Sequence, residues 1–372
     1  MKIIRDKISN YLNEDPFILN KNKKKKKFLE IIRYQIKHHL KNCKNYSIWY
    51  KKNNLINPNN IKNYEDIPFI PSAVFKNIEL KSIKNKGKII SSSGSSGMNK
   101  SSIFIDNFTS NFQKKCLSKI LTNTIGKDRK IFFIADVEPK ESFGQVQISA
   151  RYAGMSGYLL AAKERNYLFK INSNNEIEVN YNVVKKLNNI IVKEPIVIIG
   201  YTYMIYDHVI KNQNLHLTNL NCHKDTKLVH FGGWKKLHNI KVSKKEFNEK
   251  VNLKFKLKHN SILDIYGFSE QLGTIYVSEG SGGCKVSNYS HILIRDPKTL
   301  NVLEDGKVGF MQFLSILPLS YPGFSILNDD MGYISKRSFG KNIEKIEFKV
   351  HSRLDKLEMR GCGDTLPDHY YI

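Results

Sequence analysis

The sequence predicts an α/β protein with a mostly parallel sheet that is flanked by helices. Continuous apolar runs carry this prediction, and they lie at residues 130–135, 194–200, 227–231 and 261–266. Strands of a parallel sheet look like this because helices cover both faces and leave no side facing solvent. The 372 residues, of which 41% are hydrophobic, fit one large domain with appendages or two unequal domains.

The N-terminal residues 1–45 are predicted to form a helical segment that packs on the main body. Its first part is typical of a short helix followed by a break at Asp15-Pro16. Apolar residues then recur at helical spacing over residues 28–40, which predicts an amphipathic helix. The lysine run at residues 23–27 is interpreted as a solvated face.

The main domain is predicted to span residues 46–350. Prolines stiffen residues 67–71, so this segment is expected to be extended rather than helical. Residues 88–90 are predicted to form a strand and residues 103–120 a helix, with a glycine and serine loop between them.

Short apolar segments separated by turns predict an antiparallel β subdomain over residues 290–350. These segments are residues 291–295, 309–314, 332–335 and 346–350. The last residues, 351–372, are expected to form a hinge and a short C-terminal stub.

The formal net charge of +26 is compatible with a protein that binds nucleic acid or an anionic membrane surface. The excess is mainly lysine, accompanied by asparagine and isoleucine, which an AT-rich coding sequence supplies whatever the function. The lysine run contains no aromatic residue that would stack on bases. We therefore expect no nucleic-acid partner, and a basic binding protein remains the alternative from another class.

Cysteine usage and hydropathy favour a cytoplasmic protein without stable membrane insertion. The N-terminal residues carry charges throughout, and no stretch approaches ~18 apolar residues. The cysteines form no CxxC pair, so neither a disulfide framework nor a zinc site is indicated. They are Cys43, Cys116, Cys222, Cys284 and Cys362.

A loop rich in glycine and serine, placed between a predicted strand and a predicted helix, is the strongest local signal for chemistry. Backbone N–H groups, hydroxyls and a lysine in such a loop can surround phosphate oxygens. Its spacing is not that of a Walker A loop, and a flexible surface loop is the alternative. The residues are Ser92, Ser93, Gly94, Ser95, Ser96, Gly97 and Lys100.

The pentapeptide Tyr266-Gly267-Phe268-Ser269-Glu270 ends another predicted strand. Glu270 is a candidate magnesium ligand, because Mg²⁺ prefers hard oxygen atoms and usually keeps one or two protein carboxylates together with phosphates. A glycine turn with a surface glutamate is the alternative.

The segment Gly232-Gly233-Trp234 follows a third predicted strand. Glycine lets the backbone approach a nucleotide base closely, which suits an adenine-contacting loop. A tight connection with Trp234 as a core anchor is an equally good interpretation.

In their order along the chain, these segments resemble motifs of the adenylate-forming superfamily of ligases. The resemblance implies a large adenylate-forming-type domain. The phosphate-loop match extends to Lys100, with Asn99 in place of a proline. The resemblance implies ATP and Mg²⁺ as cofactors, with Tyr266 along the adenine, Ser269 near a phosphate and Glu270 on the metal.

Two further segments extend the resemblance towards the C-terminus. Asp330 resembles the aspartate that binds both ribose hydroxyls, although clusters of asparagine and aspartate also form turns. Arg353 resembles the ribose-contacting arginine, and Asp355 the hinge residue, with a surface hairpin as the alternative. Few residues follow Arg353, so we expect the mobile C-terminal domain of this superfamily to be absent or reduced to a stub.

Within the superfamily, the chain resembles the acyl-protein synthetase (LuxE-type) family of bacterial bioluminescence operons from about residue 28 to its end. Residues 67–71, 232–235, 294–297, 317–323 and 360–363 carry this resemblance. The family implies that a fatty acid is activated with ATP, captured on a cysteine near the C-terminus and passed to an acyl-CoA-type reductase.

Cys362 is the residue that fits capture. A neighbouring positive charge such as Arg360 would lower the pKa of the thiol, and the flanking glycines leave the sulfur open. With Lys100, Glu270 and Arg353, it completes the predicted catalytic set.

The alternative is an inert Cys362 in an acyl-CoA or acyl-carrier-protein ligase that uses an external thiol. The sequence does not define the acyl chain. Residues 143–160 and 201–208 are the candidates for the lining of its pocket.

Overall fold

The computed structural model describes residues 2–83, 87–91, 101–139, 155–215, 221–233 and 242–353. The chain divides into two compact units, each of which we describe by itself. Unit 1 comprises Met1–Ile120, Gly267–Thr274 and Lys285–Ile372, and unit 2 comprises Leu121–Tyr266 and Ile275–Cys284. The domain boundaries predicted after residues 45 and 350 remain predictions. In the described ranges, no helix has the length and apolarity needed to cross a membrane.

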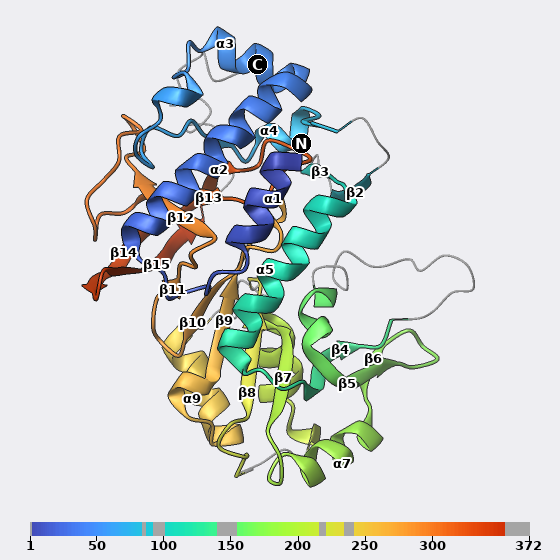
Figure 1. The fold of residues 1–372 in the computed structure, drawn as a ribbon. Coiled ribbons are helices and arrows are strands. Elements are labelled where there is room, and N and C mark those ends of the chain that lie inside the picture. Colours follow the sequence, from blue (N-terminus) through green and yellow to red (C-terminus); the bar gives the residue numbers. More distant parts are fainter. Residues whose placement is uncertain are drawn as a thin grey trace. The chain divides into compact units, whose positions relative to one another are not determined.

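Unit 2 is built on a mostly parallel sheet (Figure 1). Its parallel strands are β4 (Lys130–Val137), β5 (Ala162–Ile171), β7 (Ile196–Tyr201), β8 (Lys227–Phe231) and β9 (Ile262–Tyr266), in the order β9-β8-β7-β4-β5. The strands β10 (Tyr276–Glu279) and β6 (Ile177–Val179) add to its two ends in antiparallel pairing. Every residue of β7 is buried, and this confirms the prediction of strands covered on both faces.

Helices α7 (Tyr181–Ile190) and α9 (Lys244–Phe255) belong to the same unit. Each begins at a side chain that accepts a hydrogen bond from a first-turn N–H: Asn180 from Val183 and Ser243 from Glu246. After β7 the chain continues as α8 (Thr202–Met204) and a π-helical turn (Ile205–Ile210). Short 3₁₀ turns complete the unit at Tyr158–Ala161, Gln213–Leu215 and His259–Ser261.

Unit 1 contains the predicted antiparallel sheet. Its strands β12 (Ser290–Arg295), β13 (Gly309–Ser315), β14 (Ser325–Gly340) and β15 (Ile343–Arg353) pair consecutively. The prolines of residues 67–71 do hold an extended conformation, because β1 (Ile70–Pro71) pairs in parallel with β14. The two-residue strand β11 (Cys284–Lys285) lies where the sequence passes from unit 2 to unit 1.

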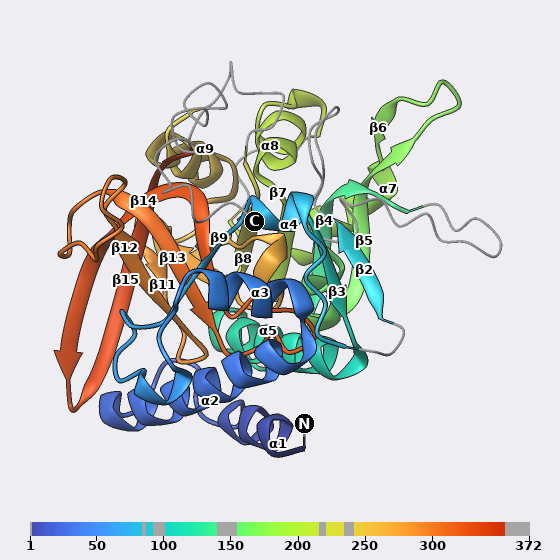
Figure 2. The same ribbon diagram turned by 90° about the horizontal axis from the view of Figure 1, so that it is seen from above.

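The N-terminal helices of unit 1 are α1 (Lys2–Tyr11), α2 (Lys21–Asn42) and α3 (Lys44–Lys52), and α1 lies beside α2 (Figure 1, Figure 2). They confirm the short helix and the amphipathic helix that the sequence predicts. Two short helical segments, Pro58–Asn60 and α4 (Val74–Asn77), follow.

The interpretation of the lysine run as a solvated face is wrong for Lys24. Helix α2 begins at Lys21, so Lys24 lies one turn before the buried Phe28 and on the same face. Lys24 is 4% exposed, and its ammonium donates to the carbonyl of Ser287 at 3.3 Å. Burial lowers the pKa of Lys24 to about 8.

The predicted helix over residues 103–120 is wrong in its first turn. Residues Ser102–Ile105 form β3, which pairs antiparallel with β2 (Lys88–Ser91), and α5 (Asn107–Ile125) starts only after it. Ile103 and Ile105 are buried in alternation, which is the period of a strand. The glycine and serine loop therefore connects two antiparallel strands rather than a strand and a helix.

Buried histidines make the stability of this fold depend on pH. His39 and His291 in unit 1 and His230 in unit 2 are at most 4% exposed, and burial lowers the pKa of each. The folded state has its full stability above the pKa of about 6.5 that these histidines have in the unfolded chain. Stability is lost as the pH falls below this value, because only the unfolded chain then binds the protons. We expect the free energy of unfolding to fall by about 1.4 kcal/mol per pH unit for each histidine.

Urea unfolding between pH 7.5 and pH 5 measures this loss. His291 stacks on Tyr64, with 3.8 Å between the ring centroids and an interplanar angle of 18°. The variant His291→Phe keeps an aromatic ring at this position and removes the group that titrates. The variant should lose less stability on acidification than the wild type, whereas the same replacement of the exposed His351 should change nothing. Equal pH dependence of the two variants would contradict this prediction.

Candidate active site

The glycines of the predicted adenine loop and Tyr266 follow neighbouring parallel strands of unit 2. Phe231 at the end of β8 is paired with Ile265 of β9, so Gly232 and Tyr266 leave the sheet at the same edge. Ligands of open α/β sheets bind at the carboxyl ends of strands. Gly232 has a φ of 73°, and a Cβ there would lie 3.0 Å from the ring of Tyr201. Both observations require glycine at this position.

Thr202, which belongs to the segment 201–208 predicted to line the acyl pocket, fixes the turn at Gly232. Its hydroxyl lies 2.9 Å from the Gly232 carbonyl oxygen and 3.3 Å from that of Phe231. It also lies 3.0 Å from Nδ1 of the buried His230. The two carbonyls can only accept, so the hydroxyl donates to them and the imidazole can donate in return.

A row of polar side chains continues from His230 across the sheet of unit 2. Asp264 on β9 faces His230 at 3.7 Å and receives the ammonium of Lys244 at 3.1 Å. Lys244 also reaches the hydroxyl of Ser278 on β10. A signal for this row exists in the sequence, because His230 and Asp264 interrupt otherwise apolar strands.

Glu270 lies in unit 1, in the 3₁₀ turn Ser269–Gln271. Its side chain is 7% exposed, and the Ser269 hydroxyl donates to Oε2 at 3.0 Å. Its backbone carbonyl accepts from the Tyr321 hydroxyl at 2.8 Å. No cluster of three or more acidic, histidine or cysteine side chains that could hold a metal occurs in the described part of the chain. A single carboxylate therefore fits a magnesium ion that also binds phosphates, but not a self-contained metal site.

Asp330 and Arg353 are cross-strand partners in unit 1, on β14 and β15. The N–H of Asp330 donates to Oδ1 of Asn328 at 3.2 Å. The neighbouring Asp329 accepts from the Ser72 hydroxyl at 2.9 Å and lies 3.9 Å from the ammonium of Lys76. Asp329 thus ties β14 to Ser72 and to Lys76 of α4, and Asp330 remains the predicted ribose ligand.

Several predicted site residues lie outside the described part of the chain. They are Ser92, Ser93, Gly94, Ser95, Ser96, Gly97, Lys100, Trp234, Asp355, Arg360 and Cys362. The prediction that the phosphate loop, Tyr266, Glu270 and Asp330 surround one nucleotide therefore stays a prediction.

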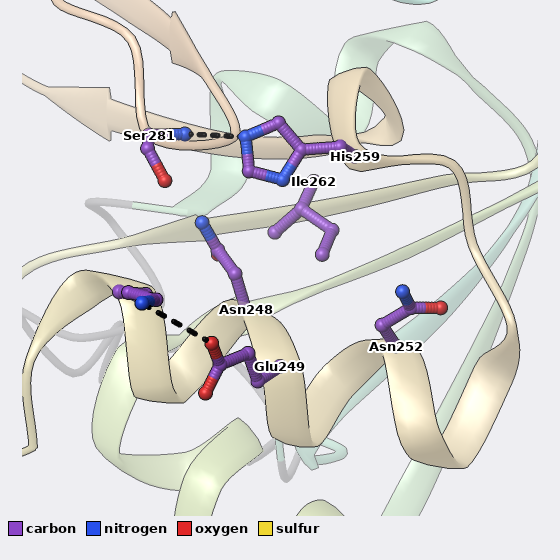
Figure 3. A pocket seen from close by; sticks show the side chains of 7 residues that line it. Asn248, Glu249, Asn252, His259, Ile262 and Ser281 are labelled. Carbon is purple, nitrogen blue, oxygen red and sulfur yellow. Dashed lines mark hydrogen bonds and ion pairs between the residues drawn. The ribbon is translucent and has the colours of Figure 1, made fainter.

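A pocket of about 210 Å³ lies elsewhere in unit 2 (Figure 3). It is lined by Lys245, Asn248, Glu249, Asn252, His259, Ile262 and Ser281. Ile262 is the first residue of β9 and Tyr266 its last, so this pocket is at the opposite end of the strand from the candidate site.

The fold is that of adenylate-forming ligases. An open-conformation structure of 2-hydroxyisobutyryl-CoA ligase, in complex with 2-HIB-AMP and CoA, matches with a TM-score of 0.66 and 11% sequence identity, covering 91% of this chain and 72% of that chain. The thioesterification state of the same enzyme matches with a TM-score of 0.62 and 11% identity, covering 91% of this chain and 70% of that chain. This likeness confirms the predicted adenylate-forming-type architecture.

The model of the family described as acyl-protein synthetase, LuxE, matches residues 3–370, and the chain belongs to this family. Its curated relatives include long-chain-fatty-acid–luciferin-component ligases. The one from Aliivibrio fischeri is 26% identical over 133 residues, which are 36% of this chain and 35% of the relative. The one from Vibrio harveyi is 27% identical over 141 residues, 38% of this chain and 36% of the relative. Each alignment thus spans about a third of the relative.

Proposed function

We propose that this chain activates a fatty acid with ATP to an acyl-adenylate and then transfers the acyl group to the thiol of Cys362. The observation that carries the proposal is the family match over residues 3–370, which includes every motif-bearing segment and Cys362. The names of the curated relatives support a long-chain fatty acid as the substrate.

In the first step, a carboxylate oxygen of the acid attacks the α-phosphorus of ATP, the bond to the β-phosphate oxygen breaks, and pyrophosphate leaves. Residues Ser92 to Gly97 and Lys100 would donate to the phosphate oxygens, where negative charge develops. Glu270 would hold Mg²⁺, which neutralises phosphate charge. Asp330 and Arg353 would bind the ribose, and Tyr266 with the loop at residues 232–234 would bind the adenine.

In the second step, the thiolate of Cys362 attacks the acyl carbonyl carbon, the bond to the phosphate oxygen breaks, and AMP leaves. The other cysteines support this choice by elimination. Burial raises the pKa of Cys43 and Cys116, and raises that of Cys222 to about 12, while Cys284 is also buried. A thiol with a raised pKa holds little of the nucleophilic thiolate at neutral pH.

The thioester would carry the acyl group to an acyl-CoA-type reductase or another acyl-accepting protein in the cytoplasm, where thiols stay reduced. An acyl-CoA or acyl-carrier-protein ligase that uses an external thiol is the competing proposal within the same class.

Exchange of labelled pyrophosphate into ATP, measured across a panel of carboxylic acids, tests the first step. We expect exchange with the wild-type protein to depend on a long-chain fatty acid and on Mg²⁺. Exchange in the absence of any acid would contradict the proposal. So would a panel in which no acid supports exchange.

A further inference from the structure

We propose that Ser320 and Tyr321 form a brace that positions Glu270 relative to strand β3, which follows the predicted phosphate loop. The inference rests on the proposed role of Glu270 as a magnesium ligand. All residues of the brace belong to unit 1 and lie in its described part.

Glu270 depends on side-chain anchors because it lies in a single 3₁₀ turn. The local backbone hydrogen bonds, from the N–H of Gln271 to Phe268 and from that of Thr274 to Gln271, are both 3.3 Å long, which is beyond the usual range. A turn held only by such bonds would leave the carboxylate loosely placed.

Tyr321 supplies a hydrogen bond to the backbone of Glu270 from a distant part of the chain. Its ring is fully buried, edge-on to Phe75, and its hydroxyl donates to the Glu270 carbonyl at 2.8 Å. Burial raises the pKa of Tyr321, so its hydroxyl keeps its proton over the physiological range. Gly323 makes room for this ring, because a Cβ there would lie 2.2 Å from it and 3.0 Å from the Glu270 carbonyl oxygen.

Ser320, the residue before Tyr321, connects the loop between β13 and β14 (residues 316–324) to β3. Its hydroxyl donates to the carbonyl of Phe104 in β3 at 2.8 Å, and its N–H donates to the Thr109 hydroxyl of α5 at 3.2 Å. Its carbonyl accepts from the N–H of Ser82 at 2.8 Å. Ser320 and Tyr321 therefore bind, respectively, the strand that follows the predicted phosphate loop and the backbone of Glu270, whose carboxylate is predicted to face the same phosphates.

Helix α2 holds this loop from its other side. The Gln35 amide donates to the carbonyls of Ile316 and Pro318 at 2.9 and 2.8 Å. His38 Nε2 lies 3.0 Å from the Leu319 carbonyl oxygen, at hydrogen-bond distance. These contacts occupy the backbone carbonyls of residues 316, 318 and 319, which lie directly before Ser320.

Such a brace has a chemical purpose in a magnesium site. Mg²⁺ requires near-ideal octahedral geometry with ligand distances of about 2.0–2.1 Å, so small displacements of its carboxylate ligand relative to the phosphates weaken its binding. Loosening the brace should therefore change the magnesium dependence of ATP binding more than it changes the fold.

The test is Tyr321→Phe, which keeps the buried ring and removes the hydroxyl. Loss of one hydrogen bond corresponds to about a three- to tenfold effect on a binding constant. We expect the Mg²⁺ concentration that gives half-maximal ATP binding, measured by calorimetry without any acid, to rise by about this factor. The matched control is Tyr289→Phe, because Tyr289 is a fully buried tyrosine of the same unit that donates to the Glu14 carbonyl at 2.6 Å.

The outcomes separate this inference from the proposed function. Equal magnesium dependence in the Tyr321 and Tyr289 variants would overturn the brace, even if the wild type catalyses acid-dependent exchange. A wild type that binds ATP with Mg²⁺ but shows no exchange would overturn the proposed function while the shift in the Tyr321 variant still supports the brace. A wild type that does not bind ATP would overturn both.

Discussion

Replacement of Glu270 with glutamine should reduce acid-dependent pyrophosphate exchange by about 100-fold or more. The amide has nearly the same shape and still accepts a hydrogen bond from Ser269, but it carries no charge to bind the metal. Removal of a single group that stabilises developing charge typically costs 10²–10³-fold in rate, and we expect at least the lower end here. The measurement is exchange at saturating ATP and acid, over a series of Mg²⁺ concentrations.

The control for this variant is Glu79→Gln, which makes the same chemical change at an exposed position of unit 1. It should leave exchange unchanged. Circular dichroism and urea unfolding should show both variants folded. If Glu270→Gln retained the activity of the Glu79 variant, Glu270 would not be the magnesium ligand.

The strands β4, β7, β8 and β9 of unit 2 could be predicted from the sequence because most of their residues are buried. The strand β5 was not predicted, because exposed and half-buried residues occupy much of its first half. Burial on both faces of a sheet leaves a continuous apolar run in the sequence. The antiparallel strands of unit 1 could be predicted because turns separate them at short intervals. Pairing order could not be read in the same way, since it depends on contacts between residues far apart in the chain.

Local patterns in the sequence predict the wrong structure at two places. The apolar residues at 103–105 continue directly into a helix, so a helical period was the simplest fit, and only the pairing with β2 distinguishes the strand. Lys24 belongs to a run of like charges, and the run conceals that the helical period turns this one lysine inward, where its ammonium binds the carbonyl of Ser287.

The candidate site divides in a similar way. Tyr266, Glu270 and Asp330 can be found in the sequence because their motifs are contiguous. The distant group that holds Glu270 cannot, because its partner is a backbone atom elsewhere in the chain: the hydroxyl of Tyr321 binds a carbonyl 51 positions away. A hydrogen bond to a carbonyl leaves no signature in the residue that supplies the carbonyl, since every residue has one.

Cys362→Ala should abolish stable acylation of the protein while leaving pyrophosphate exchange within about twofold of wild type. The two steps use different nucleophiles, so removal of the thiol blocks the second step and spares the adenylate chemistry. The measurement is incubation with ATP, Mg²⁺ and a radiolabelled fatty acid, followed by denaturation and detection of the label on the protein. A thioester should release the label at neutral pH with hydroxylamine.

Cys222→Ala is the matched control for this experiment. Cys222 is half-buried, whereas the described cysteines at positions 43, 116 and 284 are buried, and its raised pKa makes it a poor nucleophile. Its replacement should leave the label intact. Retention of the label in Cys362→Ala would assign capture to another residue. A different result would favour the external-thiol ligase: the wild-type protein exchanges pyrophosphate, never carries a label, and consumes acid only when coenzyme A or a carrier protein is added.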